Sequence, residues 1–469
     1  MAHRPTHAVV LGGGLAGTLA AAALARHLDR VTLAEPDVLP DAPAPRKGVP
    51  QARHTHLLWS GGARAIEDLV PGTTQRWLDA GARRIGMPGG IVSLSAQGWL
   101  RRWPGLEHLI ISSRDLIDWG VRHQVLADTR VTLRQGVRAT ALSGDAARVT
   151  GVVLRDEATG ESTTVEADLV VDATGRGSRA PAWLTALGLP GVTETVIDSG
   201  LAYATRVFHA PEGAGRDVPV INVQADPREP RPGRTATLVP IEGDRWQVTL
   251  SGTRGGEPPR DAEGFVAFAR AVRHPVVGDL IAGARPAGPV HSSRGNVNRR
   301  RFFERLPAWP DGFLVLGDAV ATYNPVYGHG MSVAAHGARA LGDQVGRRGL
   351  APGTARAAQR AVAGAVEGAW TTATSQDVLY PETVGPRPPV HARVLQRYVE
   401  RLMATANTRS PAARALYTAF TLSGPMTALV SPGALVATAR GPRAAPVPEP
   451  PFTREERRAL ALPVLPAGG

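Results

Sequence analysis

The sequence predicts an α/β fold in which a domain of parallel strands and helices is interrupted by a β-rich insertion and followed by a helical segment. Three observations support this prediction. An apolar run near the N-terminus ends in closely spaced glycines and leads into an Ala/Leu-rich helix. Residues 197–255 alternate with a period of two, the pattern of a half-buried antiparallel sheet. Residues 353–445 have mostly helical patterns with Pro/Gly breaks.

The N-terminal βαβ unit has the glycine spacing of a dinucleotide-binding turn. Gly12, Gly14 and Gly17 follow the apolar run at G-x-G-x-x-G spacing, and a helix is predicted over residues 15–28. The first glycine allows a tight turn, the second leaves room for a pyrophosphate, and the third lets the helix pack on the strand. The helix N-terminus presents free N–H groups to the phosphates. Glu35 ends the next strand, where a carboxylate binds ribose hydroxyls, so we predict a Rossmann-like domain.

Residues 313–331 carry a second motif, which we assign to the same ligand. A buried strand ends in the Gly-Asp-Ala turn around Asp318, and a loop containing Pro325 and Gly328 leads into a helix near Gly330. A carboxylate at this turn can accept hydrogen bonds from the ribityl hydroxyls of a flavin. The positive helix N-terminus would stabilise charge on a reduced flavin ring. The two motifs together predict FAD as the cofactor.

The predicted domain boundaries follow from this sharing of one ligand, because the sheet between the motifs must then be an insertion. The FAD-binding domain is predicted to be discontinuous, with a substrate-binding sheet inserted into it. A Pro-rich tail after the helical segment is expected to be extended or disordered. The predicted ranges are residues 1–80, 110–190 and 295–345 for the FAD-binding domain, 81–109 and 191–294 for the substrate-binding domain, 346–445 for the helical segment and 446–469 for the tail.

Composition narrows the classes of function. The chain has 469 residues and no cysteine, which excludes disulfides and thiolate nucleophiles, so redox chemistry would depend on a bound cofactor. No apolar run reaches the roughly 18 residues of a membrane-spanning helix, and we expect a cytoplasmic enzyme. The net charge is +12, but no basic block is interleaved with aromatic residues as in a nucleic-acid groove. The densest basic cluster, residues 299–301, is expected at a solvated strand edge.

Two histidines raise the question of a metal site. His54 and His56 lie two residues apart, with no carboxylate or third histidine at ligand spacing nearby. We therefore predict no metal and assign both histidines to structural roles or to contact with the flavin. His329 is expected to approach the flavin through its backbone.

A third motif, Asp172-Ala-Thr-Gly175, completes a resemblance to a known family. With the two motifs above, the chain resembles the flavoprotein monooxygenase superfamily of the para-hydroxybenzoate hydroxylase fold. Residues 46–56 and 324–331 more narrowly resemble the epoxidases of polyether ionophore biosynthesis, of the lasalocid and monensin type. That resemblance implies that reduced FAD reacts with O2 to give a C4a-hydroperoxide. Its distal oxygen would be transferred to alkenes of a linear polyene polyketide, either free or carrier-bound.

The resemblance also implies roles for individual residues. No protein side chain is expected to act as a nucleophile or acid–base catalyst, because the flavin performs the chemistry. A long apolar substrate pocket is expected, with Tyr203, Phe208 and Trp246 as candidate linings, although ordinary sheet packing is an alternative for each. The residues expected to contact FAD lie in the motif turns and neighbouring segments: Gly12, Gly14, Leu15, Ala16, Gly17, Glu35, Arg46, Arg53, Arg114, Val137, Asp318, Pro325, Gly328, Gly330 and Met331.

The source of electrons and the reaction type remain open at this point. The Ala-Thr-Gly turn departs from the Asp-Gly form of hydroxylases that bind NAD(P)H on the same chain, and no second G-x-G-x-x-G follows a strand. Both features favour a separate flavin reductase fed by NAD(P)H. An aromatic hydroxylase with a smaller, more polar pocket is one alternative. A non-catalytic lipid or prenyl carrier on the same fold is another. A halogenase is disfavoured because W-x-W-x-I-P is absent.

Overall fold

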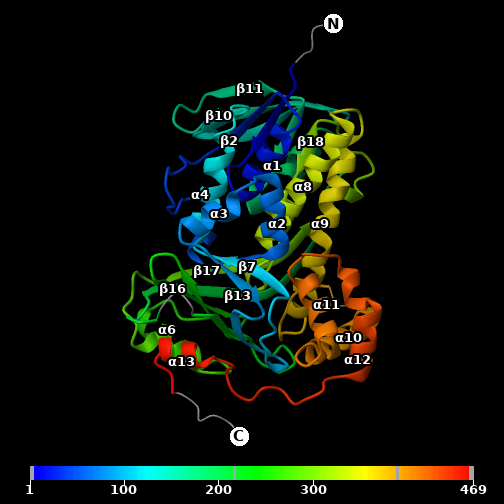
Figure 1. The fold of residues 1–469 in the computed structure, drawn as a ribbon. Coiled ribbons are helices and arrows are strands. Elements are labelled where there is room, and N and C mark those ends of the chain that lie inside the picture. The colour runs from blue at the N-terminus through cyan, green and yellow to red at the C-terminus, as the bar shows by residue number, and fades with distance from the viewer. Residues whose placement is uncertain (1–4, 215–217, 387–389, 464–469) are drawn as a thin grey trace.

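A parallel sheet forms the upper layer of the molecule (Figure 1). The computed structural model describes residues 5–214, 218–386 and 390–463. All neighbouring strands of this sheet run parallel, and almost every residue of β1 and β12 is buried. Its strand order is β18 (Phe313–Val315), β12 (Leu169–Asp172), β1 (His7–Leu11), β2 (Arg30–Glu35) and β8 (Val131–Gln135).

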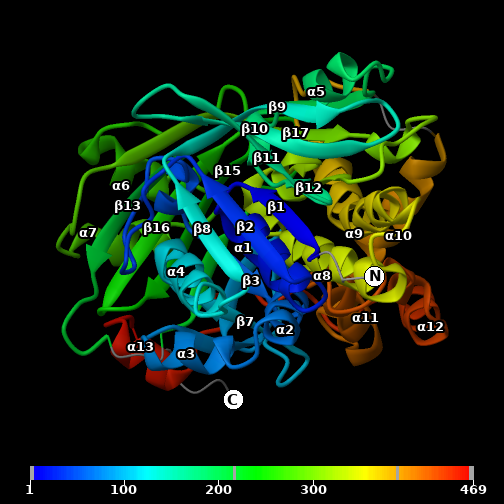
Figure 2. The ribbon, with the colours of Figure 1, turned by 90° about the horizontal axis from the view of Figure 1, so that it is seen from above.

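Helices from distant parts of the chain cover this parallel sheet. Helix α1 (Leu15–Ala25) packs against α4 (Arg114–Val125) and α8 (Gly330–Arg348), and α8 packs against α9 (Thr354–Asp377). The buried Ala and Leu side chains of α1 allow this close packing. A three-stranded sheet of β9 (Val137–Gly144), β10 (Val149–Asp156) and β11 (Ser162–Glu166) lies beside the strands (Figure 2).

An eight-stranded sheet forms the lower layer (Figure 1). One face packs on α6 (Ala262–Arg270) and α7 (Val276–Ala282) through a core containing Phe208, Trp246 and Phe265. The opposite face carries the residues that line the cavity described below. Its strand order is β19 (Ala321–Thr322), β17 (His291–Arg301), β13 (Glu194–His209), β16 (Arg245–Gly252), β15 (Arg234–Ile241), β14 (Val220–Val223), β5 (Ile91–Ser95) and β6 (Gly98–Trp99).

The C-terminal helices pack on a second three-stranded sheet. Their shared apolar core contains Trp59 and Leu109 from the sheet and Leu402 and Tyr417 from the helices. The elements involved are β3 (Leu57–Trp59), β4 (Arg83–Met87), β7 (Glu107–Ile111), α10 (Val390–Ala406), α11 (Ser410–Phe420) and α12 (Pro432–Arg440). The parallel sheet, the inserted sheet and this helical segment confirm the predicted fold class. None of the described helices has the length and apolar character needed to cross a membrane.

Two local expectations are wrong. The tail contains a helix, α13 (Arg454–Ala459), which begins with a capping box between Thr453 and Glu456. Glu456 also pairs with Arg102, which ties the tail to the loop after β6. The basic cluster is not a solvated edge, because β17 lies between β13 and β19. Arg300 and Arg301 are therefore only 5% and 8% exposed.

Candidate functional site

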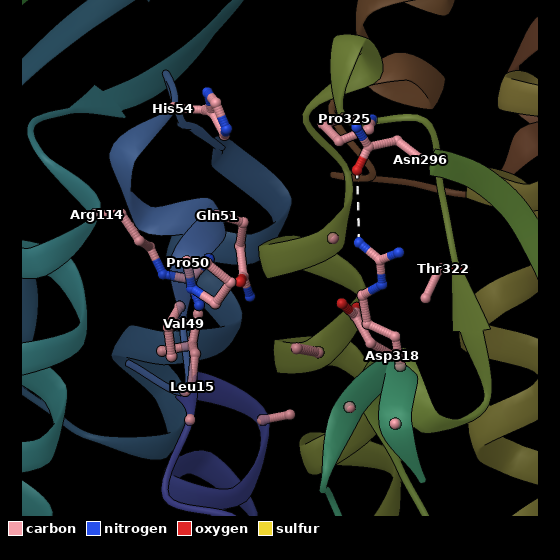
Figure 3. Close-up of a pocket in the computed structure, with 18 of the residues that line it drawn as sticks. Leu15, Val49, Pro50, Gln51, His54, Arg114, Asn296, Asp318, Thr322 and Pro325 are labelled. Atoms are coloured by element: carbon pink, nitrogen blue, oxygen red, sulfur yellow. Dashed lines mark hydrogen bonds between the residues drawn. The ribbon is translucent and has the colours of Figure 1, made fainter. Parts of the chain in front are cut away.

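A cavity of about 1260 Å³ lies where the parallel sheet meets the eight-stranded sheet. Figure 3 shows Leu15, Val49 and Arg114 on one side of it and Asp318 and Thr322 on the other. Its volume exceeds the roughly 300–1,000 Å³ of a pocket for one drug-sized ligand. The cavity therefore has room for a dinucleotide together with a second molecule.

The glycine turn after β1 forms one wall of this cavity. Gly12 has a φ of +96°, and its N–H donates to the Ala34 carbonyl at 2.8 Å. A Cβ on Gly17 would lie 1.8 Å from the Gly12 carbonyl oxygen, so only glycine allows α1 to start so close to the strand. A Cβ on Gly14 would meet only the Arg46 guanidinium, at 3.6 Å. The turn is tight on its protein side and open on its cavity side, as a pyrophosphate requires.

Glu35 is held at the edge of the cavity by backbone and side-chain donors. Its Oε2 accepts from the Gly13 N–H at 2.6 Å, and its Oε1 accepts from the Asp37 N–H at 3.0 Å. Arg46 Nη1 lies 3.1 Å from Oε2 and is buried without a hydrogen-bond partner in the described chain. The arginine balances the charge of the carboxylate and retains a donor for a ligand.

Asp318 faces the cavity from the short turn after β18. Within the described part of the chain, no residue donates a hydrogen bond to its carboxylate. Burial raises the pKa of Asp318, while the charges of Arg114 and Arg176 lower it. Arg301 supports the same turn by donating to the Ala319 carbonyl at 3.2 Å. An acceptor with free lone pairs at this place fits the ribityl hydroxyls of a flavin.

Two further arginines line the cavity, one in the turn at residues 50–53 and one at the start of α4. Arg114 begins α4, and its Nε donates to Asp118 Oδ1 at 2.7 Å, which fixes the guanidinium beside the turn at residues 50–53 (Figure 3). Arg53 Nη1 lies 3.3 Å from His291 Nδ1 of β17. Each guanidinium uses one nitrogen for its partner, so its remaining N–H groups can donate to an anionic ligand.

The loop at residues 324–328 ends in helix α8 at the cavity. Gly328 has a φ of +67°, and the Trp59 indole N–H donates to the adjacent Tyr327 carbonyl at 3.1 Å. A Cβ on Gly330 would meet nothing within 4 Å, so the first turn of α8 opens on free space. Its backbone N–H groups are available to an anionic ring.

A buried carboxylate that the sequence did not reveal fixes this loop. Asp377 at the end of α9 is 1% exposed. It accepts from Asn324 Nδ2 at 3.0 Å and from the Tyr327 hydroxyl at 2.8 Å. Asn298 Nδ2 donates to it at 2.7 Å, and Ser199 Oγ at 3.3 Å. An acid in the last turn of a helix opposes the helix dipole, which is the one local signal of its role.

The histidines near the cavity are neutral at pH 7. His54 Nδ1 lies 2.8 Å from Thr205 Oγ1, and burial, with minor contributions from His291 and Arg53, lowers its pKa to about 4. Burial lowers the pKa of His56 to about 3 and that of His329 to about 4. The described residues contain no group of three or more His, Asp or Glu side chains placed to hold a metal ion.

The structure separates the three candidate substrate residues. Tyr203 lines the cavity, and its hydroxyl donates to Asn324 Oδ1 at 2.9 Å. Phe208 pairs with Trp246 across β13 and β16 on the opposite, helix-covered face. Those two rings therefore pack the core and do not reach the cavity. The cavity face itself is polar, contrary to the expected apolar lining, because its strands present Thr, Ser, Asn and Gln side chains.

The residues expected to contact FAD converge on this one cavity, although they come from both ends of the chain. Gly17 is the exception, since it lies beneath the turn and packs α1 on β1. Those that line the cavity are Gly12, Gly14, Leu15, Ala16, Glu35, Arg46, Arg53, Arg114, Val137, Asp318, Pro325, Gly328, Gly330 and Met331.

Comparisons with known proteins show that flavoproteins share this fold. Residues 6–211 match the family described as pyridine nucleotide-disulphide oxidoreductase. The structure is similar to PqsL of Pseudomonas aeruginosa, described as a probable FAD-dependent monooxygenase, with 18% identity, a TM-score of 0.57 and coverage of 89% of this chain and 100% of that one. A flavoprotein/dehydrogenase from Cytophaga hutchinsonii gives a TM-score of 0.65 at 13% identity, covering 92% of this chain and 98% of that one.

These likenesses define the class: the chain has the fold of the flavoprotein monooxygenases. A sequence relative then identifies the family. The chain is 32% identical over 351 residues to Protein Rv3254 of Mycobacterium tuberculosis, an alignment that covers 71% of this chain and 73% of that protein. The chain belongs to the family of Protein Rv3254.

Proposed function

We propose that this chain is an FAD-dependent monooxygenase. The observation that carries the proposal is the convergence of the glycine turn after β1 and the turn at Asp318 on a single large cavity. The donor set fits the cofactor, since backbone N–H groups lie at two helix N-termini and Asp318 has free lone pairs. Arg46 and Arg114 supply positive charge for the phosphates.

Each part of the site would have a distinct task in binding. The α1 N-terminus would hold the pyrophosphate, and Glu35 would orient a ribose. Asp318 would accept from the ribityl chain, while the first turn of α8 would stabilise negative charge on the ring. FAD, when bound and reduced, supplies the electrons that activate O2 for transfer of one oxygen atom to the substrate.

The chain's own contribution to the reaction is positioning and exclusion of water. The loop at residues 324–328 is fixed by Asp377, so the wall beside the ring position is rigid. His54 is neutral and held by Thr205, so it adds no charge at the substrate end. The substrate would lie between this loop and the eight-stranded sheet, oriented toward the site of oxygen transfer.

As the finer reaction, we propose epoxidation of alkenes in a polyene polyketide, with electrons from NAD(P)H through a separate reductase. This proposal is supported by the resemblance of residues 46–56 and 324–331 to polyether epoxidases. Aromatic hydroxylation is the second candidate, and the polar cavity face favours it. Both reactions insert one atom of O2 into the product.

Turnover under ¹⁸O2 tests the proposal. Purified protein with FAD, a flavin reductase and NADPH would be given a linear polyene or a phenol of similar length, and products would be analysed by mass spectrometry. One labelled oxygen per epoxide supports epoxidation, and one per new phenolic hydroxyl supports the second candidate. An oxygenated product without label contradicts a monooxygenase. FAD-loaded protein whose reduced flavin does not react with O2 also contradicts it and favours a carrier role.

A further inference from the structure

The cavity face of the eight-stranded sheet carries two parallel rows of polar side chains. In the first row, strand pairing aligns Asn222 with Thr237, and Thr237 with Thr249. In the second row it aligns Thr235 with Ser251, and Ser251 with Tyr203. Gln224 directly follows β14 and, by the same alternation, extends the second row. Neighbouring strands lie about 4.8 Å apart, and residues two apart on a strand about 7 Å, which sets the spacing of the rows.

Hydrogen bonds within the protein occupy the hydroxyls of the first row. Thr237 Oγ1 donates to Asn222 Oδ1 at 3.0 Å. Thr249 Oγ1 lies 2.7 Å from Thr205 Oγ1 and donates to Thr55 Oγ1 at 2.8 Å. These hydroxyls therefore stabilise the cavity wall, and in this row only the side-chain NH2 of Asn222 is left to donate to a ligand.

The second row remains open except at Tyr203, whose hydroxyl donates to Asn324. Among the described residues, nothing bonds to the hydroxyls of Thr235 and Ser251 or to the side-chain amide of Gln224, yet all three residues line the cavity. Polar groups inside a folded protein bond to another group, to water or to a ligand. Three adjacent strands therefore present donors and acceptors that only the cavity contents can satisfy.

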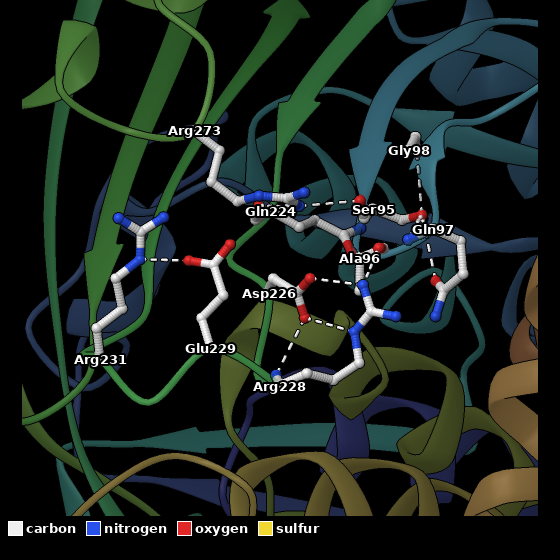
Figure 4. A network of polar contacts seen from close by, with 10 residues as sticks. All are labelled: Ser95, Ala96, Gln97, Gly98, Gln224, Asp226, Arg228, Glu229, Arg231 and Arg273. Atoms are coloured by element: carbon white, nitrogen blue, oxygen red, sulfur yellow. Dashed lines mark hydrogen bonds and ion pairs between the residues drawn. The ribbon is translucent and has the colours of Figure 1, made fainter. Parts of the chain in front are cut away.

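The end of this row is held rigidly by a polar network. Arg273 Nη1 donates to the Ser95 carbonyl at 2.9 Å and to the Gln224 carbonyl at 3.3 Å (Figure 4). The Gln224 N–H donates to the Leu94 carbonyl at 2.9 Å. The following loop is fixed in turn, because Arg228 Nε donates to Asp226 Oδ1 at 2.8 Å (Figure 4). Gln224 therefore enters the cavity from a backbone that is fixed before a ligand binds.

We propose that the substrate is an oxygen-rich molecule whose hydroxyl or carbonyl oxygens bind to Gln224, Thr235 and Ser251, and that these residues determine specificity. Hydroxyl and amide groups can both donate to and accept from such oxygens. A pure hydrocarbon chain would leave them unpaired, and sites built to hydrogen-bond a substrate reject analogues that lack the polar group. The inference rests on the proposed function, because the same cavity would hold FAD.

A matched pair of probes tests the inference on the FAD-loaded protein. trans-Stilbene and its trihydroxylated derivative resveratrol share one carbon skeleton and differ in their oxygens. Binding would be followed by the change in absorbance of the bound flavin. Resveratrol is expected to bind about tenfold or more tightly than stilbene. Thr235→Val and Ser251→Ala should each weaken resveratrol binding by roughly three- to tenfold and leave stilbene binding unchanged.

Two control variants separate recognition from folding. Thr235→Ser keeps the hydroxyl and should retain tight resveratrol binding. Thr164→Val removes a solvent-exposed hydroxyl on β11, outside the cavity, and should bind both probes as the wild type does. Thermal unfolding of every variant checks that the fold is intact.

The outcomes distinguish this inference from the function on which it rests. Equal binding of the two probes, no binding of resveratrol, or equal losses for both probes in Thr235→Val would each overturn the inference while FAD remains bound. Wild-type protein that fails to retain FAD would instead contradict the proposed function. Selective loss of resveratrol binding with retention of FAD supports both.

Discussion

Before any ligand binds, the two acidic residues expected to contact the cofactor differ in the number of hydrogen bonds that they accept. Glu35 already accepts hydrogen bonds from two backbone N–H groups and lies beside Arg46. Asp318 accepts none from the described chain, although burial raises its pKa. A ligand therefore adds more hydrogen bonds at Asp318 than at Glu35.

Replacing Asp318 should consequently weaken cofactor binding. Hydrogen bonds to a charged group contribute about 1.5–3 kcal/mol, so Asp318→Ala should raise the Kd for FAD by roughly ten- to a hundredfold. Fluorescence titration of apoprotein with FAD measures this effect. Asp343→Ala, which removes an exposed carboxylate of α8, is the matched control and should leave the Kd unchanged. Unaltered FAD affinity in Asp318→Ala would show that the ribityl contact has been misplaced.

Buried histidines should make the protein less stable in acid. Burial lowers the pKa of His329 from 6.5 to about 4, and its Nε2–H donates to the Phe420 carbonyl at 2.8 Å. Between these pH values the unfolded chain binds more protons, so the free energy of unfolding falls as pH decreases from 6.5 towards 4. At about 1.36 kcal/mol per pKa unit, the loss from this residue is on the order of 3 kcal/mol.

The variant His329→Gln tests whether His329 causes this loss of stability, because it removes the titrating group and keeps a donor for the Phe420 carbonyl. Urea unfolding at about pH 7 and about pH 4.5 should show a smaller loss of stability in this variant than in the wild type. The other buried histidines keep some pH dependence in both proteins. Equal losses in the two proteins would show that His329 does not titrate in this range.

Single residues could be predicted from the sequence where their function depends on neighbours in the chain. The glycines of the first turn and Asp318 belong to local motifs, and all except Gly17 line the cavity. Alternation showed that Phe208 and Trp246 lie in strands, but it gives no information on which face meets the cavity. Asp377 contacts Asn324 across 53 residues of sequence, so no local pattern could indicate its partners, and its place in the last turn of a helix is the one local signal.

At the scale of secondary structure, the turn between β1 and α1 requires very close contact between the backbones of Gly12 and Gly17. A Cβ at position 17 would lie 1.8 Å from the Gly12 carbonyl oxygen, so Gly17→Ala must displace α1 from β1. The same change at Gly364 in α9 would meet nothing within 4 Å. The change from glycine to alanine is therefore expected to lower stability at position 17 and to raise it at position 364.

Gly17→Ala should lose FAD and unfold several degrees below the wild type. Gly364→Ala should keep FAD and gain up to about 1 kcal/mol, because alanine is the better helix former. Differential scanning fluorimetry together with the flavin content of the purified proteins measures both effects. Retention of FAD and stability in Gly17→Ala would contradict the close approach.

Most helices and strands could be predicted from periodicity and from Gly/Pro punctuation, whereas α13 could not. The composition of its segment predicts an extended, Pro-rich tail. The signal present was the capping box formed by Thr453 and Glu456, which predicts a helix start even in such a context. Its position against Arg102 depends on tertiary contact and has no local signature.

At the scale of the whole molecule, the two large sheets are linked beside the cofactor turn. β17 pairs with β19 directly after the Asp318 turn, and Arg300 at this junction pairs with Glu304 and Glu367. The sequence could predict that distant motifs share one ligand, because each motif accounts for only part of FAD. It could not predict the polar cavity face, since that depends on which face of the eight-stranded sheet lies against the cavity.

The turn at Asp172 and the glycine-rich turn after β1 bear on the source of the electrons that reduce the flavin. Asp172 is fully buried and accepts from the Thr174 N–H and hydroxyl and from the Ser178 hydroxyl, so its carboxylate is committed within its own turn. In the described chain, the only G-x-G-x-x-G turn between a strand and a helix is the one after β1. We propose that this turn binds FAD, and a nicotinamide nucleotide would then need a site of another kind.

NADPH alone should therefore reduce the bound flavin slowly, and an added flavin reductase should restore turnover. Anaerobic stopped-flow absorbance at the flavin maximum would measure the rate of reduction with NADPH, with NADPH plus reductase, and with dithionite. Fast reduction by dithionite shows that the bound flavin is accessible to electrons, so slow reduction by NADPH then means that NADPH does not bind productively to this chain. Rapid bleaching by NADPH without a partner would instead require a nicotinamide site on this chain. It would also show that the hydrogen bonds of the Asp172 carboxylate within its own turn do not prevent reduction by NADPH.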